Sequence, residues 1–240
     1  MNDQTTLDTG WCEVSVKRRK QRKSITILVK EGRVQVNAPL RMPAVDVQLL
    51  IENKRAWIER ALAKQQTAIQ ETSKRIEPGE LFLYQGKRYP LRIETGNSDA
   101  IYLSDDQHLT MRSTKLYSPE HLFERLSDWY RQQATAYLME KTHFYAQKLG
   151  HFPSSIEIKS YRARWGSCSA KGAIHYNWRI IMAPLDVIDY VVVHELCHLV
   201  EHNHSSRFWQ IVARFDKAYQ SHRQWLKQYG DYLHIHHVKS

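Results

Sequence analysis

The chain has 240 residues, of which 42% are hydrophobic and 25% are charged, and its formal net charge at pH 7 is +10. These proportions are typical of a globular protein with one large core and room for a smaller lobe. No apolar run is long enough to span a membrane, and the polar first ten residues lack the basic start and apolar middle of a secretory signal. We therefore expect a cytoplasmic protein without membrane contact.

The amino-terminal part, residues 1–115, is predicted to be a basic, β-rich lobe that includes one helix. Its most basic segment, Lys17–Lys23, can contact a polyanion such as nucleic acid, or can be a solvated turn before a strand. A hairpin is expected next, with its turn at Glu31-Gly32, and then a helix from Pro43 to about Ile69. Strand candidates in this lobe are Ser24–Val29, Val34–Val36, Leu81–Tyr84, Tyr89–Ile93, Ile101–Leu103 and Leu109–Met111.

The remaining residues, 116–240, are predicted to form a second domain of mixed helices and strands. Residues Ala173–Met182 alternate between apolar and polar side chains, which indicates a half-buried strand paired back on the preceding segment. The apolar density of Val187–Val200 predicts a buried helix. The other elements expected here are a helix from Pro119 to about Leu149, a strand at Ile156–Lys159 and a helix at Ser206–Tyr219.

The predicted Val187–Val200 helix carries the segment His194-Glu195-Leu196-Cys197-His198. Because four residues make about one helical turn, His194 and His198 point the same way, and Glu195 is rotated by roughly 100°. Two imidazoles on one face suit a shared Zn²⁺ ion, and the carboxylate can accept a proton from a metal-activated water and later donate it. The pattern predicts metal ligands at His194 and His198 and a catalytic general base and acid at Glu195.

The third metal ligand has several candidates behind this helix. His204 follows His198 by six residues, the spacing at which a chain that leaves a helix and doubles back presents a third imidazole to the same ion. His202 would lie in line with the first two ligands, and Glu201 shares that geometry and better suits a hydrogen bond to an imidazole N–H. We favour His204, with Ser205 as the cap of the following helix.

The three cysteines, Cys12, Cys168 and Cys197, are too few and too widely spaced to predict a disulfide framework. Cys197 lies between two candidate metal ligands, but a small apolar filler on a buried helix is the favoured interpretation. Cys168 as a nucleophile is disfavoured, since no histidine stands at a recognisable spacing from it.

The segment His194–His198 and the following His204 resemble the motif of the YgjP-like (SprT-related) zinc metallopeptidases. The resemblance implies a compact α+β, zincin-like catalytic domain, in which a short antiparallel sheet packs against the histidine-bearing helix and backing helices. It also implies three histidine ligands, His194, His198 and His204. Metzincin peptidases have glycine where this chain has Glu201, which argues against that branch. The segments that carry the resemblance are His194–Leu199, Asn203–Ser205 with Phe208-Trp209, Arg164–Cys168, and Asn177–Arg179 leading to Ala183-Pro184.

The favoured function is therefore a zinc-dependent metallopeptidase acting on a peptide or protein. Arg164 and Tyr161 are candidate donors to the developing oxyanion, and Arg179 is a further candidate for substrate binding. An edge strand opposite the helix is expected to pair with an extended substrate.

Two alternatives stay open. A metal-dependent nucleoside triphosphate pyrophosphohydrolase could hold phosphates with Arg162, Arg164, Arg179 and the basic run. A nucleic-acid-associated binding module with a structural zinc would need a fourth protein ligand. The tail histidines His234, His236 and His237 can collect metal adventitiously or belong to a solvated terminus.

Overall fold

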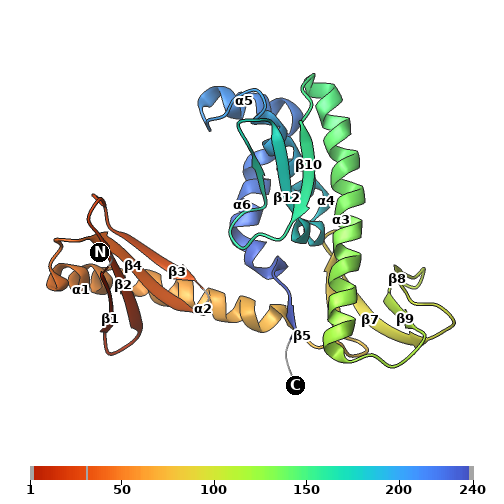
Figure 1. Cartoon of the computed structure of the whole chain (residues 1–240), viewed down its shortest axis with the longest axis horizontal. Helices are drawn as coiled ribbons and strands as arrows, with labels where there is room; N and C mark the ends of the chain where they lie inside the picture. Colours follow the sequence, from red (N-terminus) through yellow and green to blue (C-terminus); the bar gives the residue numbers. More distant parts are fainter. Residues whose placement is uncertain (1–2, 31, 238–240) are drawn as a thin grey trace. The chain divides into compact units, whose positions relative to one another are not determined.

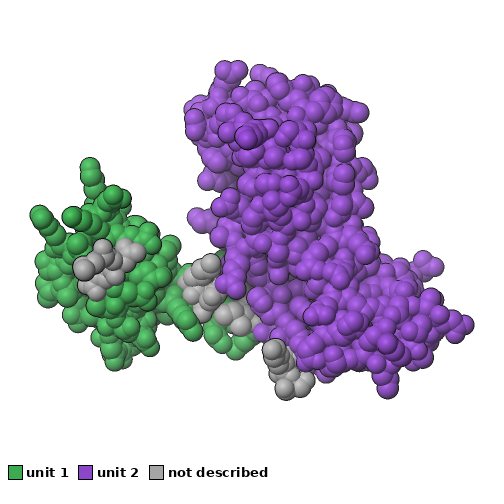
Figure 2. All heavy atoms as spheres, in the orientation of Figure 1, with its two compact units in different colours: residues 1–71 green, residues 72–240 purple. Residues whose placement is uncertain are grey.

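The computed structural model describes residues 3–30 and 32–237, which form two compact units, residues 1–71 (unit 1) and 72–240 (unit 2) (Figure 2). The sequence predicted a boundary after residue 115. Instead, Leu91, Leu109 and Met111 belong to the same buried cluster as the helices of unit 2. No helix in the described part of the chain is both long and apolar enough to cross a membrane.

Unit 1 is a four-stranded sheet with two helices, and the strand order is β1-β2-β4-β3 (Figure 1). β2 and β4 are parallel, and the outer pairs are antiparallel. Alternating valines of β2 and β4 pack with Ile51 and Ile58 of the helices, so one face of the sheet forms the core. The elements are β1 (Asp3–Asp8), β2 (Glu13–Arg19), β3 (Thr26–Lys30), β4 (Arg33–Pro39), α1 (Ala44–Asn53) and α2 (Arg55–Thr72).

Several predictions for unit 1 need correction. The single helix predicted from Pro43 is two helices, because the backbone breaks at Lys54, with φ −103° and ψ 6°. The basic run is not wholly a turn, since its first three residues, Lys17–Arg19, belong to β2. In the predicted hairpin turn, Gly32 has a φ of +71°, a conformation that favours glycine. The other turn residue, Glu31, lies outside the described residues.

The first part of unit 2 is a sheet with the order β6-β7-β9-β8. All four strands were predicted from the sequence. β7 and β9 are parallel, and the other two pairs are antiparallel. The elements are β5 (Ser73–Lys74), β6 (Leu81–Tyr84), β7 (Lys87–Thr95), β8 (Ala100–Leu103) and β9 (Leu109–Ser113).

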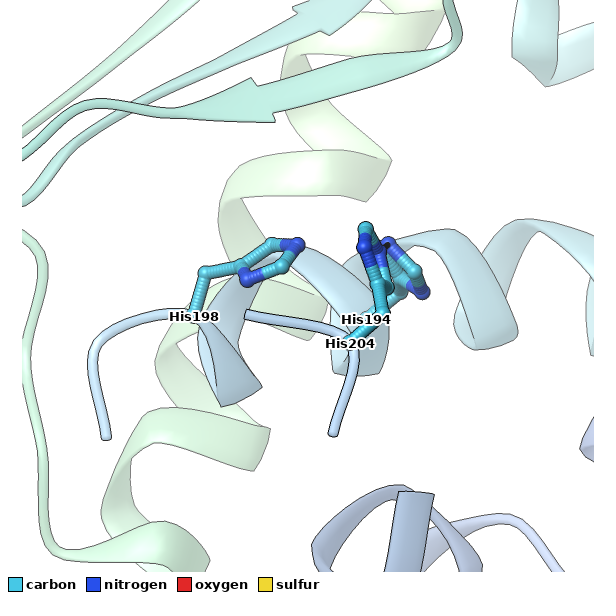
Figure 3. Close-up of side chains that lie close together, drawn as sticks. All are labelled: His194, His198 and His204. Atoms are coloured by element: carbon cyan, nitrogen blue, oxygen red, sulfur yellow. Dashed lines mark hydrogen bonds between the residues drawn. The ribbon is translucent and has the colours of Figure 1, made fainter. Parts of the chain in front are cut away.

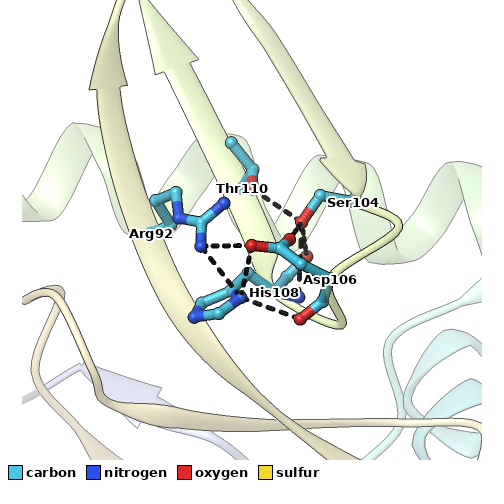
Figure 4. Close-up of polar contacts among 5 residues, drawn as sticks. All are labelled: Arg92, Ser104, Asp106, His108 and Thr110. Carbon is cyan, nitrogen blue, oxygen red and sulfur yellow. Dashed lines mark hydrogen bonds and ion pairs between the residues drawn. The ribbon is translucent and has the colours of Figure 1, made fainter.

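A polar network fixes the turn between β8 and β9 (Figure 4). Arg92 Nη2 donates to Asp106 Oδ2 at 2.5 Å, and Ser104 Oγ donates to Asp106 Oδ1 at 2.6 Å. These contacts hold the pKa of Asp106 well below its usual range. The network is far from the predicted histidine cluster in sequence, and its members satisfy one another, so we interpret it as structural.

The helix α3 (Pro119–Leu149) runs the length of unit 2 (Figure 1). Ser118 caps its start by accepting from the backbone N–H of His121, and Gly150 ends it at φ +74°. The buried residues of α3 include Leu126, Tyr130 and Leu138. These side chains pack in the core with α4 (Leu185–Cys197). The long helix thus backs the helix that carries the predicted metal ligands.

The second sheet of unit 2 has the order β10-β12-β11 and is mixed, which corrects the predicted antiparallel sheet. β11 is antiparallel to β12, as predicted, but β10 runs parallel to β12 because it lies on the other side of it. The predicted strand Ala173–Met182 ends at Asn177, whose side chain accepts from the N–H of Arg179 and starts a 3-10 helix. The elements are β10 (Ser155–Lys159), β11 (Gly166–Cys168), β12 (Ala173–Asn177) and η1 (Trp178–Met182).

The carboxyl-terminal helices are shorter than predicted and more numerous. The predicted helix Ser206–Tyr219 ends at Phe215, and a further helix follows that the sequence did not predict, because none of its residues is buried. The tail pairs with β5 in parallel, and Ile235 is buried, so it is not simply a solvated terminus. These elements are α5 (Ser206–Phe215), α6 (Tyr219–Tyr229), η2 (Gly230–Leu233) and β13 (His236–His237).

Candidate metal centre

Helix α4 places His194 and His198 one turn apart on the same side, as the spacing predicted (Figure 3). The centroids of the two rings are 5.0 Å apart. His198 is the residue at which the helix ends, and the turn behind it tightens, since the N–H groups of Leu199 and Val200 bond to carbonyls three residues back. The turn redirects the chain and brings the next segment back beside the helix.

His204, on the returning segment, completes a cluster of three imidazoles. Its Nε2 lies 3.0 Å from Nε2 of His194, and its ring centroid is 4.8 Å from that of His198. One ligand atom from each of the three residues lies within 4.8 Å of the others. Ser205 caps α5 directly afterwards by accepting from the backbone N–H of Phe208 at 3.3 Å. This cap fixes the point at which the chain turns into the next helix.

The donor atoms of this cluster fit a divalent cation such as Zn²⁺. Two ligand nitrogens of a tetrahedral zinc ion are about 3.3 Å apart, which is close to the separation of the His194 and His204 nitrogens. His198 Nδ1 donates to the backbone carbonyl of Glu201 at 3.1 Å, and this leaves Nε2 free to act as a ligand. The sequence had suggested Glu201 as such a partner, and the group in question is its carbonyl rather than its carboxylate.

The protonation states of the histidines suit metal binding. Burial, reinforced by the neighbouring imidazoles, lowers the pKa of His194 to about 3, and burial also lowers the pKa of His198. Both rings are therefore neutral near pH 7, with lone pairs available to a cation. The aromatic rings of Phe208 and Trp209 lie against the cluster and hold the imidazoles in place, with the Phe208 centroid 4.6 Å from that of His198.

Glu195 is buried beside this cluster, with 6% of its surface exposed. Burial raises its pKa to about 8, and the charge of Arg164 acts in the opposite direction. A neighbouring dication would favour the carboxylate. A Cβ added at Gly166 of β11 would stand 2.6 Å from both Cγ and Oε1 of Glu195, so only glycine leaves room for the carboxyl group here.

The cluster opens into a cavity of about 450 Å³. Strand β11 forms one wall and the histidine-bearing segments form the other. β11 is the edge of its sheet, because its other side has no partner strand among the described residues. The lining residues are Gly166, Ser167, Cys168, Ala170, His194, Glu195, His198, His202 and His204.

The predicted substrate-binding residues do not line this cavity. Arg164 is close enough for its charge to affect Glu195, and its guanidinium lies 5.5 Å from the ring centroid of Tyr161. Arg179 is held elsewhere, with its Nη1 donating to Ser160 Oγ at 2.7 Å and its guanidinium 4.4 Å from a ring centroid of Trp178. Roles for Arg164 and Tyr161 stay predictions, and the contacts of Arg179 favour a structural one.

Three other side chains lie near the site: the two cysteines considered in the sequence, and a tyrosine that the sequence analysis missed. Cys197 is buried, with 1% exposed, as expected of a filler. Cys168 does line the cavity, but burial raises the pKa of its thiol to about 11, which disfavours a nucleophilic thiolate. Tyr190 was missed, although its hydroxyl lies 3.4 Å from His194 Nδ1. Its position one turn before His194 on an apolar helix could have indicated this contact.

Comparison with known proteins identifies the class. A family model of a metallopeptidase domain matches residues 23–229, which is most of the chain. The chain belongs to the YgjP-like family, and membership of a metallopeptidase family implies a divalent metal ion. The family expected from the histidine and tryptophan motifs is thus confirmed.

Comparisons with individual proteins add little. Among solved structures, the chain is similar to the crystal structure of the metallopeptidase zymogen of Pyrococcus abyssi abylysin. The TM-score is 0.34 at 21% identity, over 38% of this chain and 93% of that chain. A search of curated proteins gave no match. The assignment to the family therefore rests on the match of the family model to residues 23–229.

Proposed function

We propose that this protein is a zinc-dependent peptidase in which His194, His198 and His204 hold the metal and Glu195 is the general base and acid. The observation that supports this most directly is the convergence of three imidazoles beside a buried carboxyl group, within a cavity of about 450 Å³. A zinc ion held there supplies Lewis acidity toward the scissile carbonyl and lowers the pKa of water.

The protein's own residues then carry out the proton transfers. Glu195 accepts the proton of the attacking water and later donates it to the leaving amine. Its buried position beside Gly166 limits competing hydration of the carboxylate and fixes its direction. Arg164 or Tyr161 is the candidate donor to the oxyanion that forms on the carbonyl.

Substrate binding is proposed to use the free edge of β11. An extended peptide can add to this edge as a further strand, and its backbone then passes along the wall of the cavity opposite the three histidines. The contact would depend on backbone groups, so the amino-acid preference of the enzyme would come from elsewhere.

The alternatives of a nucleotide hydrolase and a structural zinc site have less support. Arg179, one of the predicted phosphate ligands, is held by Ser160 and Trp178. Of the described residues, three histidines and no fourth group form the metal-binding cluster, whereas a closed structural site usually has four protein ligands.

Two measurements test the proposed function. Elemental analysis of untagged protein should give one zinc per chain, and His204→Ala should lower that ratio. The same preparation should cleave an unfolded protein and should release no pyrophosphate from a panel of nucleoside triphosphates. Pyrophosphate release without peptide cleavage would contradict the peptidase proposal, and zinc binding without any hydrolysis would favour the structural site.

A further inference from the structure

A second cavity of unit 2, of about 470 Å³, lies between the end of α3 and helix α5. It is as large as the histidine-lined cavity and shares no lining residue with it. Its lining includes the apolar side chains Val200 and Ile211. It is also lined by four exposed side chains, of which Lys148, Arg207 and Arg214 are basic and His151 is titratable; we call these four the rim.

The basic side chains of this rim are not paired with carboxylates among the described residues. No carboxylate is among the residues that line the cavity. Among the residues that the structure describes, Lys148, His151, Arg207 and Arg214 form no ion pair with an Asp or Glu. Lys148 Nζ lies over the Phe144 ring, 4.0 Å from its centroid. Like charges gathered around a concave surface attract an anion from solution.

Helix dipoles explain only part of this arrangement. Lys148 and Arg214 lie in the last turns of α3 and α5, where a helix favours a cation. Arg207, however, lies in the first turn of α5, where the helix favours an anion, and that turn contains no acidic residue. Arg207 therefore adds positive charge where the local structure disfavours it, which is expected if it binds a ligand.

The basic cavity is connected to the candidate metal centre through one short segment. Val200 and Arg207 line the cavity, and the residues between them include His202 and His204, which line the other one. The same loop thus has the metal ligand on one side and the basic rim on the other. A chain bound in the basic cavity would lie close to the segment that shapes the metal centre.

We propose that this basic cavity binds an acidic segment of a protein substrate and so selects which proteins are cleaved. The proposal rests on the proposed peptidase function. Several carboxylates on one segment complement Lys148, Arg207 and Arg214, and apolar side chains between them suit the lining residues Val200 and Ile211. This contact supplies the side-chain preference that strand addition at β11 does not.

The binding test does not require catalysis. A fluorescein-labelled peptide of alternating Glu and Leu is titrated with the zinc-loaded protein, and anisotropy is measured at two salt concentrations. We expect Arg207→Glu/Arg214→Glu to weaken binding at least tenfold, and Arg207→Lys/Arg214→Lys to keep most of it. The matched control, Lys87→Glu/Lys115→Glu, reverses two exposed charges elsewhere in unit 2 and should bind like the wild type. Equal binding by all four proteins would overturn the proposal.

The cleavage test links the cavity to the peptidase. Two substrates share a neutral cleavable core, and one carries an acidic extension. We expect the extension to lower KM at least fivefold for the wild type, and this advantage to disappear in Arg207→Glu/Arg214→Glu while kcat for the neutral core and the zinc content stay unchanged. An advantage that survives in that variant would overturn the proposal.

The two tests separate the failure of each idea. Loss of peptide binding in the Glu variant, with no cleavage of any substrate by the wild type, would contradict the peptidase and leave the acidic-segment site supported. A single-stranded oligonucleotide of equal charge serves as the competitor. If it binds more tightly than the peptide and depends on the same two arginines, the assignment to acidic protein segments is wrong.

Discussion

The two units of this protein differ in what they bury. The described core of unit 1 is entirely apolar and consists of valines, isoleucines and one alanine. Among the described residues of unit 2, by contrast, seven polar or charged side chains are buried, and Glu195 is the ionisable one among them. Burying a carboxyl group is costly unless it is compensated. The burial of Glu195 therefore supports the role proposed for it, and unit 1 has no buried ionisable side chain among its described residues.

The strongest test of this contrast is Glu195→Gln, which keeps the shape of the side chain and removes its proton-transfer capacity. We expect peptide hydrolysis to fall by about 1000-fold, because general acid–base catalysis contributes on this scale. The zinc content, measured by elemental analysis, should not change. Glu201→Gln is the matched control, since Glu201 contacts His198 through its backbone carbonyl, and it should stay active. A fully active Glu195→Gln would remove the carboxylate from the mechanism.

The next test moves Glu195 without replacing it. Gly166→Ala places a methyl group 2.6 Å from Oε1 of Glu195, so the carboxyl group must shift. A displacement of about 1 Å in an active site can cost on the order of 100-fold, and we expect kcat to fall by about that factor with little change in KM. Steady-state kinetics on a short peptide measures this. Ser167→Ala, at the next position of β11, should have a much smaller effect, and equal losses in both variants would contradict the steric argument.

A third test asks whether the two cores are separable. Ile51 is 1% exposed in the core of unit 1, so Ile51→Ala should lower the stability of that unit by about 2–5 kcal/mol. Hydrogen exchange should accelerate at residues 13–53 and stay slow in α4, while cleavage of a short peptide changes by less than about twofold. The counterpart in unit 2, Ile188→Ala, should have the opposite pattern. Loss of activity in Ile51→Ala would show that unit 2 depends on unit 1.

The smallest effect is expected at a surface carboxylate of unit 2. Asp99 accepts from the Tyr117 hydroxyl at 2.6 Å and from the Thr114 N–H at 2.7 Å, and these hydrogen bonds lower its pKa from 3.8 to about 2. Because the folded-state pKa is depressed, its contribution to stability is present above pH 3.8 and is lost as the pH falls toward 2. Thermal melts should place Asp99→Asn slightly below the wild type at pH 7, with the difference disappearing near pH 2. A difference that is independent of pH would contradict this assignment.

The parts of the molecule that the sequence predicted are those governed by local patterns. Short β-rich segments separated by turn residues predicted β6 to β9, and apolar density predicted α4. The spacing of His194 and His198 predicted their shared direction, and the six-residue step to His204 predicted the third member of the cluster, which lies within 4.8 Å of the others. Each of these features depends on residues that are close together in the chain.

The features that the sequence did not predict depend on long-range contacts. β1 is too polar to show strand periodicity, yet it pairs with β2 along its whole length. The clash that fixes Gly166 involves Glu195, which lies in a different element, and the basic cavity combines side chains from the end of α3 with others from α5. No local pattern encodes such proximity. For the same reason, the mixed sheet was mistaken for an antiparallel one, since the direction of β10 depends on which side of β12 it joins.

The parallel pairing of β5 with β13 has a consequence for protein engineering. It brings residues 73–74, at the beginning of unit 2, beside residues 236–237, near the end of the chain. Domains whose ends are adjacent tolerate circular permutation, because a short linker can join the old termini without strain. A version of unit 2 that is closed at this strand pair and reopened at a distant exposed turn would keep the histidine-bearing segments continuous, and it would offer new attachment points for fusion partners.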